Sequence, residues 1–295
     1  MTLEQLRIFV AVAERLHMTR AAEALGLTQS AASAAVAALE ARYGAKLFDR
    51  VGRGLVLSDA GEAFLPEARA VLARVAAASV ALEDLAGLKR GHVTLFASQT
   101  IASYWLPPRM MRFTRAHPRI DLALKVGNTA QVAAAVLEGE AELGFAEGVV
   151  EAPLLAHIRV GSDRLAILAA PDHPLAGVGK VTLTDLAAAA WVGREPGSGT
   201  RSEFEHALTG LGLAPETLNR VLDLPSNEAV LAAACAGGVL APVSELAASP
   251  MIATGRLVRI AFDLPERPFE LLTHRGRRRS RAASAFIAEL EGAAD

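Results

Sequence analysis

Residues 19–43 read TRAAEALGLTQSAASAAVAALEARY and contain two helical segments separated by a turn at Gly26. Thr19 is expected to cap a short first helix, and Thr28 is expected to cap a longer second helix over 29–43. Glycine adopts the left-handed backbone conformation that a tight turn between helices requires. Two helices joined in this way are typical of a helix-turn-helix.

The flanking segments extend this unit on both sides. Before it, apolar residues recur at helical spacing through 3–15, after a capping-box pair formed by Thr2 and Gln5. After it, KLFDRVGRGLVL at 46–57 predicts two short strands around a glycine-flanked arginine, which is the form of a basic wing. The sequence therefore predicts a winged helix-turn-helix over 1–58, all helical apart from the β wing.

The second helix of the motif has small and polar residues on its outward face. Such a helix fits the major groove of DNA, where amides and hydroxyls reach base edges while arginines of a wing meet phosphates. The residues predicted to contact DNA are Arg20, Thr28, Gln29, Ser30, Ser33, Arg50 and Arg53. A three-helix module that binds another protein is the alternative.

A long helix is predicted over 59–90, with Pro66 kinking its first turns. Apolar residues alternate along it at spacings of four and three, the pattern of a coiled-coil seam. The seam residues are Phe64, Ala68, Val71, Val75, Ala78, Leu82 and Leu85. Such a seam favours a homodimer, which matches the two-fold symmetry of a palindromic operator. Packing of the stripe on its own chain is the alternative.

Residues 91–295 show apolar strands that alternate with helical stretches, the pattern of an α/β domain. We expect strands near 93–97, 120–126, 143–146, 165–170, 191–192, 219–224, 239–241, 256–260 and 270–274. We expect helices near 104–116, 129–138, 182–189, 199–211, 226–236, 243–248 and 280–291.

Several predicted helices of this domain start with small polar residues, just beyond the ends of strands. In open α/β sheets ligands bind there, close to the free N–H groups of helix N-termini. The predicted effector-binding residues are Ser98, Gln99, Thr100, Asn128, Thr129, Glu147, Gly197, Ser198, Gly199, Thr200, Arg201, Ser226 and Asn227. Most of these residues suit a small oxyanion or carboxylate. For each turn considered alone, ordinary helix capping is the alternative explanation.

Two charged members of this set have other interpretations. Arg201 is expected to pair with the anion or with Glu147, and a surface position is the alternative. Glu147 would repel an anion, so a structural role or a contact to a cationic group suits it better. Glu195 is a candidate for orienting the glycine loop.

Composition and motifs restrict the possible functions. With 52% hydrophobic and 21% charged residues, the chain is expected to be globular, without a spanning segment, and the N-terminus does not have the layout of a secretory signal. A cytoplasmic location is therefore expected. The seven histidines are scattered without a metal-binding or catalytic motif, so neither an enzyme, a metal site nor a cofactor is predicted. A cleft enzyme or a solute-binding protein for a small anion is the alternative.

Short motifs spread along the first sixty residues resemble the N-terminal domain of LysR-type transcriptional regulators. They are Leu6-Arg7-Ile8-Phe9, Thr19-Arg20-Ala21-Ala22, Thr28-Gln29-Ser30-Ala31-Ala32-Ser33, Leu39-Glu40, Leu47-Phe48-Asp49-Arg50 and Ala60-Gly61. The remainder is similar to the effector domain of that family, whose fold is that of type 2 periplasmic binding proteins. The resemblance implies promoter DNA as a partner, a homotetramer whose promoter contacts a small ligand rearranges, and contact with RNA polymerase.

The family fold also implies domain boundaries for this chain. The DNA-binding domain would span 1–58 and the linker helix 59–90. Lobe I of the effector domain would combine 91–163 with 269–295, and lobe II would span 164–268, with hinge crossings near 162–164 and 265–268. A hinge between lobes allows a ligand cleft to close.

Ser30 departs from the proline that most family members have, and Ala34 and Ala35 replace a basic or amide pair, so base reading by this helix differs here. Ser30 and five segments of the effector domain resemble the CysL-like subgroup of sulphur-metabolism regulators. The segments are Ala97-Ser98-Gln99-Thr100-Ile101, Gly127-Asn128-Thr129, Gly144-Phe145-Ala146-Glu147-Gly148, Arg194-Glu195-Pro196-Gly197-Ser198-Gly199-Thr200-Arg201 and Ser226-Asn227-Glu228. This resemblance implies sulphite, sulphate or another small anion as the effector.

Overall fold

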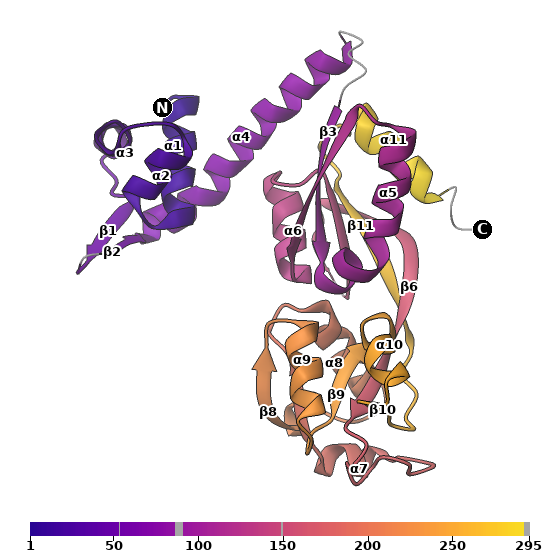
Figure 1. Cartoon of the computed structure of the whole chain (residues 1–295). Helices are drawn as coiled ribbons and strands as arrows, with labels where there is room; N and C mark the ends of the chain where they lie inside the picture. Colours follow the sequence, from indigo (N-terminus) through magenta and orange to yellow (C-terminus); the bar gives the residue numbers. More distant parts are fainter. Residues whose placement is uncertain (53, 86–90, 149, 292–295) are drawn as a thin grey trace. The chain divides into compact units, whose positions relative to one another are not determined.

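The computed structural model describes residues 1–52, 54–85, 91–148 and 150–291, and the chain forms two compact units (Figure 1). The elements of the N-terminal unit are α1 (Leu3–Arg15), α2 (Met18–Ala24), α3 (Gln29–Tyr43), β1 (Phe48–Val51), β2 (Gly54–Leu57) and α4 (Asp59–Leu85). Strands β1 and β2 pair antiparallel as a hairpin. The predicted winged helix-turn-helix is therefore confirmed.

Side-chain caps determine where the first three helices begin. The predicted threonine caps at Thr2 and Thr28 are present at the starts of α1 and α3. Helix α2 starts earlier than predicted, because Nδ1 of His17 accepts a hydrogen bond from the backbone N–H of Arg20 at 3.3 Å. The prediction that Thr19 caps α2 is therefore wrong, and Thr19 lies in the first turn of the helix.

The core of the N-terminal unit also includes the beginning of α4. One apolar cluster joins the three short helices through Ile8, Ala11, Val12, Ala21, Ala22, Ala32 and Val36. A second cluster contains Phe9, Ala68 and, at its edge, Phe64, whose ring centroid lies 5.2 Å from that of Phe9. Phe64 and Ala68 thus pack within their own domain, which corrects the prediction that they belong to a dimer seam.

The C-terminal unit combines parallel and antiparallel strands. Its strands are β3 (Gly91–Ser98), β4 (Ile120–Gly127), β5 (Leu143–Glu147), β6 (Leu155–Ala169), β7 (Ala190–Arg194), β8 (Asn219–Leu224), β9 (Ala241–Ser244), β10 (Val258–Arg259) and β11 (Glu266–His274). Its helices are α5 (Leu106–Ala116), α6 (Thr129–Glu138), α7 (Leu183–Ala188), α8 (Gly199–Gly210), α9 (Asn227–Cys235), α10 (Glu245–Ala253) and α11 (Arg281–Glu291), with a π-helical turn at Ile101–Trp105 and a 3-10 turn at Pro215–Thr217. These elements overlap the predicted ranges.

These elements form two lobes (Figure 1). Lobe I contains parallel strands β4, β3 and β5, which pack with α5 and α11 around the aromatic residues Trp105, Phe113, Phe145, Phe269 and Phe286. Lobe II contains the parallel pair β7 and β8 together with β9, surrounded by α7, α8, α9 and α10. The main sheet follows the order β10, β6, β11, β5, β3, β4, and β9 also pairs with β6.

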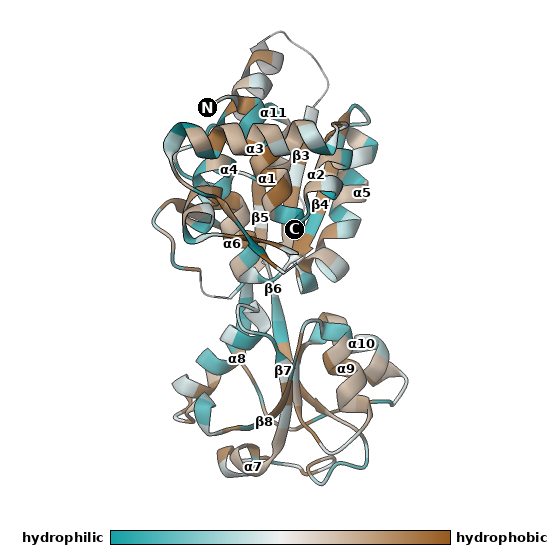
Figure 2. Ribbon diagram, turned by 90° about the vertical axis from the view of Figure 1, so that its left-hand side faces the viewer, coloured by the Kyte–Doolittle hydropathy of each residue, from teal (hydrophilic) through white to brown (hydrophobic). Residues whose placement is uncertain are grey.

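Strands β6 and β11 pass from one lobe to the other as an antiparallel pair. Within β6, half-buried and exposed residues alternate through 156–160, whereas 165–169 are all buried. This strand starts ten residues before the strand predicted near 165, so the predicted crossing at 162–164 lies inside a continuous strand. Figure 2 shows the crossing segment of β6 in the hydrophilic colour, in keeping with Ser162, Asp163 and Arg164.

Candidate functional site

The predicted DNA-contacting residues gather at the start of α3, on α2 and on the hairpin. Exposed members of the set are Arg20, Thr28, Gln29, Ser30 and Arg50. Ser33 is partly buried, and Arg53 lies outside the described residues. The hydroxyl of Thr28 accepts from the backbone N–H of Ala31 at 3.2 Å and lies 3.0 Å from the hydroxyl of Ser30. Thr28 therefore caps the start of α3, while Gln29 is exposed to solvent.

Glu40 holds the wing hairpin against α3, a role that the sequence analysis missed. Its Oε1 atom accepts from the backbone N–H groups of Leu47 at 2.7 Å and Phe48 at 3.3 Å. A carboxylate that accepts two backbone N–H groups satisfies donors that would otherwise lack partners at the strand start. This contact joins α3 to the start of β1, the strand that carries Arg50.

Along α4, the predicted seam is exposed only beyond its first turns. Val71 is 40% exposed and Leu82 is 69% exposed, and Ala78 is exposed while Val75 is half-buried. The side chain of Leu85 lies outside the described part of the chain. The described residues therefore leave an apolar row on the later turns of α4.

On lobe I, polar residues at the ends of two neighbouring strands bind each other. The hydroxyl of Ser98, at the end of β3, donates to the carboxylate of Glu147 at the end of β5. Thr129, at the start of α6, donates to the main-chain carbonyl of Glu147 at 2.6 Å. All three residues are buried. Glu147 thus receives hydroxyl donors, which suits a structural role.

On lobe II, Arg194 connects the end of β7 with the start of α9. Its Nη1 atom donates to the side-chain oxygen of Asn227 at 2.9 Å. Its Nε and Nη2 atoms donate to the two carboxylate oxygens of Glu195 at 2.8 and 3.0 Å. Arg194 is buried and was not among the residues predicted for the site.

Hydrogen bonds then join the two lobes. The backbone N–H of Asn227 donates to the side chain of Gln99 at 2.7 Å, and its amide nitrogen donates to the hydroxyl of Thr100 at 3.1 Å. The amide of Asn128 donates to Glu195 at 3.3 Å. The backbone carbonyl of Gly197 accepts from the N–H of Ala130 at 3.1 Å. Four predicted polar turns therefore meet where the two lobes are in contact, the place of the predicted cleft.

Arg267 lies where β11 crosses between the lobes and is 1% exposed. Its Nη2 atom donates to Asp163 of β6 at 2.7 Å, and these two residues face each other in the strand register. Its Nη1 atom donates to the hydroxyl of Thr200 at 3.2 Å and lies 3.6 Å from Glu147. The guanidinium therefore joins the hinge to both walls of the cleft.

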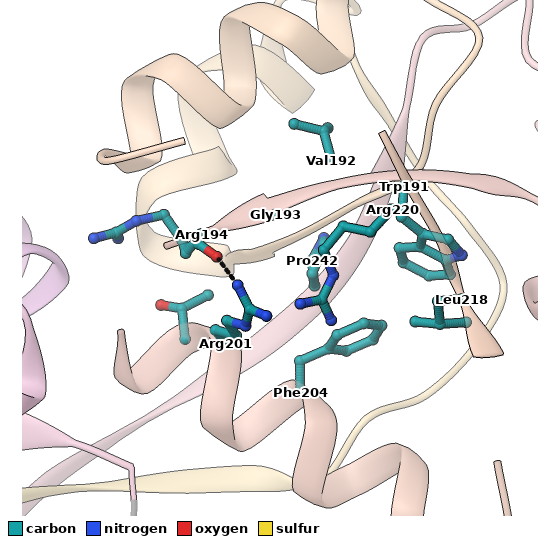
Figure 3. A pocket seen from close by; sticks show the side chains of 10 residues that line it. Trp191, Val192, Gly193, Arg194, Arg201, Phe204, Leu218, Arg220 and Pro242 are labelled. Atoms are coloured by element: carbon teal, nitrogen blue, oxygen red, sulfur yellow. Dashed lines mark hydrogen bonds between the residues drawn. The ribbon is translucent and has the colours of Figure 1, made fainter. Parts of the chain in front are cut away.

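Two predicted effector residues have other roles. Arg201 pairs with Glu205 and Asp223, each at 2.9 Å, so the expected pairing with Glu147 is wrong. Its guanidinium also donates to the carbonyl of Arg194 at 3.2 Å, beside a cavity of about 10 Å³ between β7 and α8 (Figure 3). Ser226 accepts from the N–H of Ala229 at 3.0 Å and is a helix cap.

Two titratable groups outside this network have shifted pKa values. Burial raises the pKa of Glu203, and Arg267 and His206 oppose that shift. Burial, and then Glu228, raise the pKa of Tyr104, whose hydroxyl lies 3.4 Å from a carboxylate oxygen of Glu228. Within the described ranges, neither a grouping of residues suited to a metal ion nor a helix able to cross a membrane is present.

Comparison with protein families identifies both units. The family described as "Bacterial regulatory helix-turn-helix protein, lysR family" matches residues 3–62, and "LysR substrate binding domain" matches 86–295. The chain belongs to the LysR family. It is therefore a DNA-binding transcriptional regulator with an effector-binding domain, and not an enzyme, as the sequence predicts.

Among LysR-type relatives, YeiE of Escherichia coli is 35% identical over 97% of this chain and 96% of its own length. CbbR of Rhodospirillum rubrum is 33% identical over 99% and 96% of the two chains. CysL of Bacillus subtilis is 30% identical over 81% of this chain and 79% of its own length, a weaker match than the other two. The relatives establish the family, and they do not single out the CysL-like subgroup.

Solved structures of LysR-type regulators have the same fold. Full-length CbnR in complex with its target DNA matches with a TM-score of 0.70 at 21% identity and 100% coverage of both chains. The regulatory domain of CcmR from Synechocystis PCC6803, in complex with 2-PG, matches with a TM-score of 0.63 at 25% identity. This match covers 69% of the present chain and 97% of CcmR.

Proposed function

We propose that this LysR-type regulator binds its promoter through α3 and the wing and changes its promoter contacts when a small anion enters the interlobe cleft. The DNA-contacting set is the exposed group Arg20, Gln29, Ser30 and Arg50 together with Thr28, Ser33 and Arg53. Amide and hydroxyl side chains on α3 suit base edges, and the arginines suit phosphates.

The observation that carries the effector proposal is the meeting of four polar turns from two lobes in one cleft. The effector-facing set comprises Ser98, Gln99, Thr100, Asn128, Thr129, Gly197, Ser198, Gly199, Thr200 and Asn227, with Glu147 in a supporting position. A ligand that binds between lobes exchanges such contacts for its own, and it thereby shifts the lobe equilibrium.

The ligand class follows from donor chemistry and from resemblance. Hydroxyl, amide and guanidinium donors suit a compact oxyanion or carboxylate. Similarity to CysL favours a sulphur oxyanion, whereas similarity to CcmR, whose regulatory domain binds 2-PG, favours a phosphorylated anion. We place the DNA-binding domain at 1–58, the linker helix at 59–90, lobe I at 91–163 and 269–295, and lobe II at 164–268. A homodimer through α4, a homotetramer built from two such dimers, and contact with RNA polymerase complete the proposal.

The proposal is tested by thermal unfolding of the full chain with sulphite, sulphate, phosphate, 2-PG and malonate at matched ionic strength. Saturable binding adds about 2.7 kcal/mol of stability at a hundred-fold excess over Kd, so an effector raises Tm by several degrees. Thr100→Val removes the hydroxyl that accepts from Asn227 and is expected to reduce this shift while leaving promoter binding by gel shift unchanged.

Thr114→Val is the matched control, because Thr114 is exposed on α5 and its hydroxyl bonds only to the preceding helical turn. It should respond to the anion as wild type does. A full response by Thr100→Val would show that Thr100 does not belong to the effector site. If no anion of the panel gives a saturable shift in Tm, the proposal of an anionic effector is wrong.

A further inference from the structure

The carboxylate of Glu195 lies on the guanidinium of Arg194 in a two-point contact. Both carboxylate oxygens accept, one from Nε at 2.8 Å and the other from Nη2 at 3.0 Å. This fork geometry is the one by which arginine recognises a carboxylate or a planar face of an oxyanion. The site that an anionic ligand would use is therefore occupied by a side chain of the same protein.

The same carboxylate reaches across the cleft. Its Oε1 atom accepts from the amide of Asn128 in lobe I at 3.3 Å, while Arg194 belongs to lobe II. An acid group held by an arginine from one lobe and an amide from the other makes the contacts expected of a bound effector. Glu195 thus joins the lobes as an internal ligand.

The two arginines buried in the described cleft differ in how firmly their partners are fixed. Arg267 pairs with Asp163, whose side chain is 2% exposed, within the hinge ribbon. Arg194 pairs with Glu195, whose side chain is 25% exposed. Glu195 therefore has access to solvent, which Asp163 lacks, and water can solvate its carboxylate when another anion replaces it at Arg194.

A buried guanidinium without a counter-charge is strongly unfavourable, so Glu195 leaves Arg194 only when another anion replaces it. We propose that Arg194 is the anion-binding residue of the cleft and that Glu195 is a built-in competitor, displaced by the carboxylate or oxyanion of the effector. The inference rests on the proposed effector function. Exchange breaks the Glu195 contact with Asn128, so occupancy of Arg194 changes the link between the lobes.

The test compares anion affinity, measured by thermal shift and by calorimetry with sulphite, phosphate, 2-PG and malonate, in full-length variants. Glu195→Gln removes the competing charge and keeps the size of the side chain. If Glu195 holds Arg194 in about nine molecules of ten, its removal tightens apparent binding about ten-fold. Arg194→Met is expected to abolish binding of the same anion, and Arg194→Lys, which loses the two-point contact, is expected to weaken it.

Glu205→Gln is the matched control. It removes one acid from the same lobe, and Glu205 pairs with Arg201 and Arg220 outside the cleft. Its anion affinity should stay within about two-fold of wild type, since Glu205 is already neutralised by two arginines and makes no contact with Arg194 or Asn128. Equal tightening by both variants would show a general charge effect and overturn the competitor role.

The failure of this inference can be distinguished from the failure of the proposed function. If wild type binds an anion and Glu195→Gln binds it no more tightly, the competitor assignment is wrong while the effector cleft stands. If Arg194→Lys and Arg194→Met both bind as wild type does, Arg194 is not the anion-binding residue. If neither wild type nor Glu195→Gln binds any of the four anions, the anionic effector itself is excluded.

Discussion

Glu203, on α8, is a residue whose ionisation costs stability. Burial raises its pKa, with Glu147 and Glu270 acting in the same direction, while Arg267 and His206 act against it. A raised pKa means that the folded state holds the proton more tightly than the unfolded state does. The stabilising contribution of Glu203 is therefore complete below the ordinary pKa of 4.5 and is lost as pH rises through the folded value.

Glu203→Gln keeps the shape of the side chain and removes the charge that costs stability. The variant should therefore unfold at a higher temperature than wild type at pH 7. The difference should shrink as pH falls through the raised folded pKa of Glu203 and should be lost below 4.5, the ordinary pKa of the group. Thermal unfolding from pH 4 to pH 8 measures it. Glu205→Gln, on the same helix, breaks ion pairs with Arg201 and Arg220 and should lower Tm instead. A less stable Glu203→Gln at pH 7 would show that attraction to Arg267 outweighs burial.

Among individual residues, the sequence predicts the place of the small polar residues in the candidate site better than that of their charged partners. The hydroxyls and amides of Thr100 and Asn227 follow strand ends, so fold topology alone places them in the cleft. Arg267 and Asp163 are 104 positions apart and meet only through the register of β6 and β11. Spacing along the chain gives no signal for such a pair. Arg194, by contrast, lies in the segment 194–201 that carries the family resemblance, and only its partner was not predicted.

The start of helix α8 depends on a close backbone contact with β5. A Cβ atom on Gly199 would lie 1.9 Å from the carbonyl oxygen of Glu147 and 2.4 Å from the hydroxyl of Thr129. Neither neighbour is the flexible end of a long side chain, so Gly199→Ala should displace the helix and cost about 1–3 kcal/mol. We expect Tm to fall by about 2–4 °C for each kcal/mol.

Gly210→Ala, at the other end of α8, is the control, because nothing lies within 4 Å of its added Cβ. Its Tm should equal or exceed that of wild type, since alanine favours helix over glycine. Equal Tm losses in the two variants would show that the close contact at β5 does not constrain the helix.

Strand β6 shows why the sequence predicts only part of some secondary-structure elements. Its second half, 165–169, is buried on both faces and forms a continuous apolar run, which predicts a strand. Its first half has apolar residues at alternate positions from Ala156 to Val160, the signature of a one-sided strand, and no strand was predicted there. The helix-turn-helix, by contrast, rests on local caps and periodicity, so the sequence predicts it almost completely.

For the whole molecule, the proposed homodimer would bring two DNA-binding domains to one operator, and α4 provides a surface for their pairing. Val71, Ala78 and Leu82 are exposed on one side of the helix, while Phe64 and Ala68 are already packed within the domain. The single chain therefore leaves apolar area that a second α4 would cover. Burying a leucine side chain contributes about 1.5–3 kcal/mol, so placing a charge there should oppose association strongly.

Leu82→Glu should weaken self-association at least about ten-fold, because it loses that burial and places a carboxylate in the seam. Sedimentation velocity over a range of concentrations measures the change, and gel shift on a two-site operator should show a parallel loss, since each monomer then binds a half-site alone. Ala76→Glu adds the same charge at an exposed position on the opposite side of α4 and should leave both measurements unchanged. A Leu82→Glu protein that still sediments and binds as wild type would move the dimer contact away from α4 and require the effector domains to hold the two operator-binding units together.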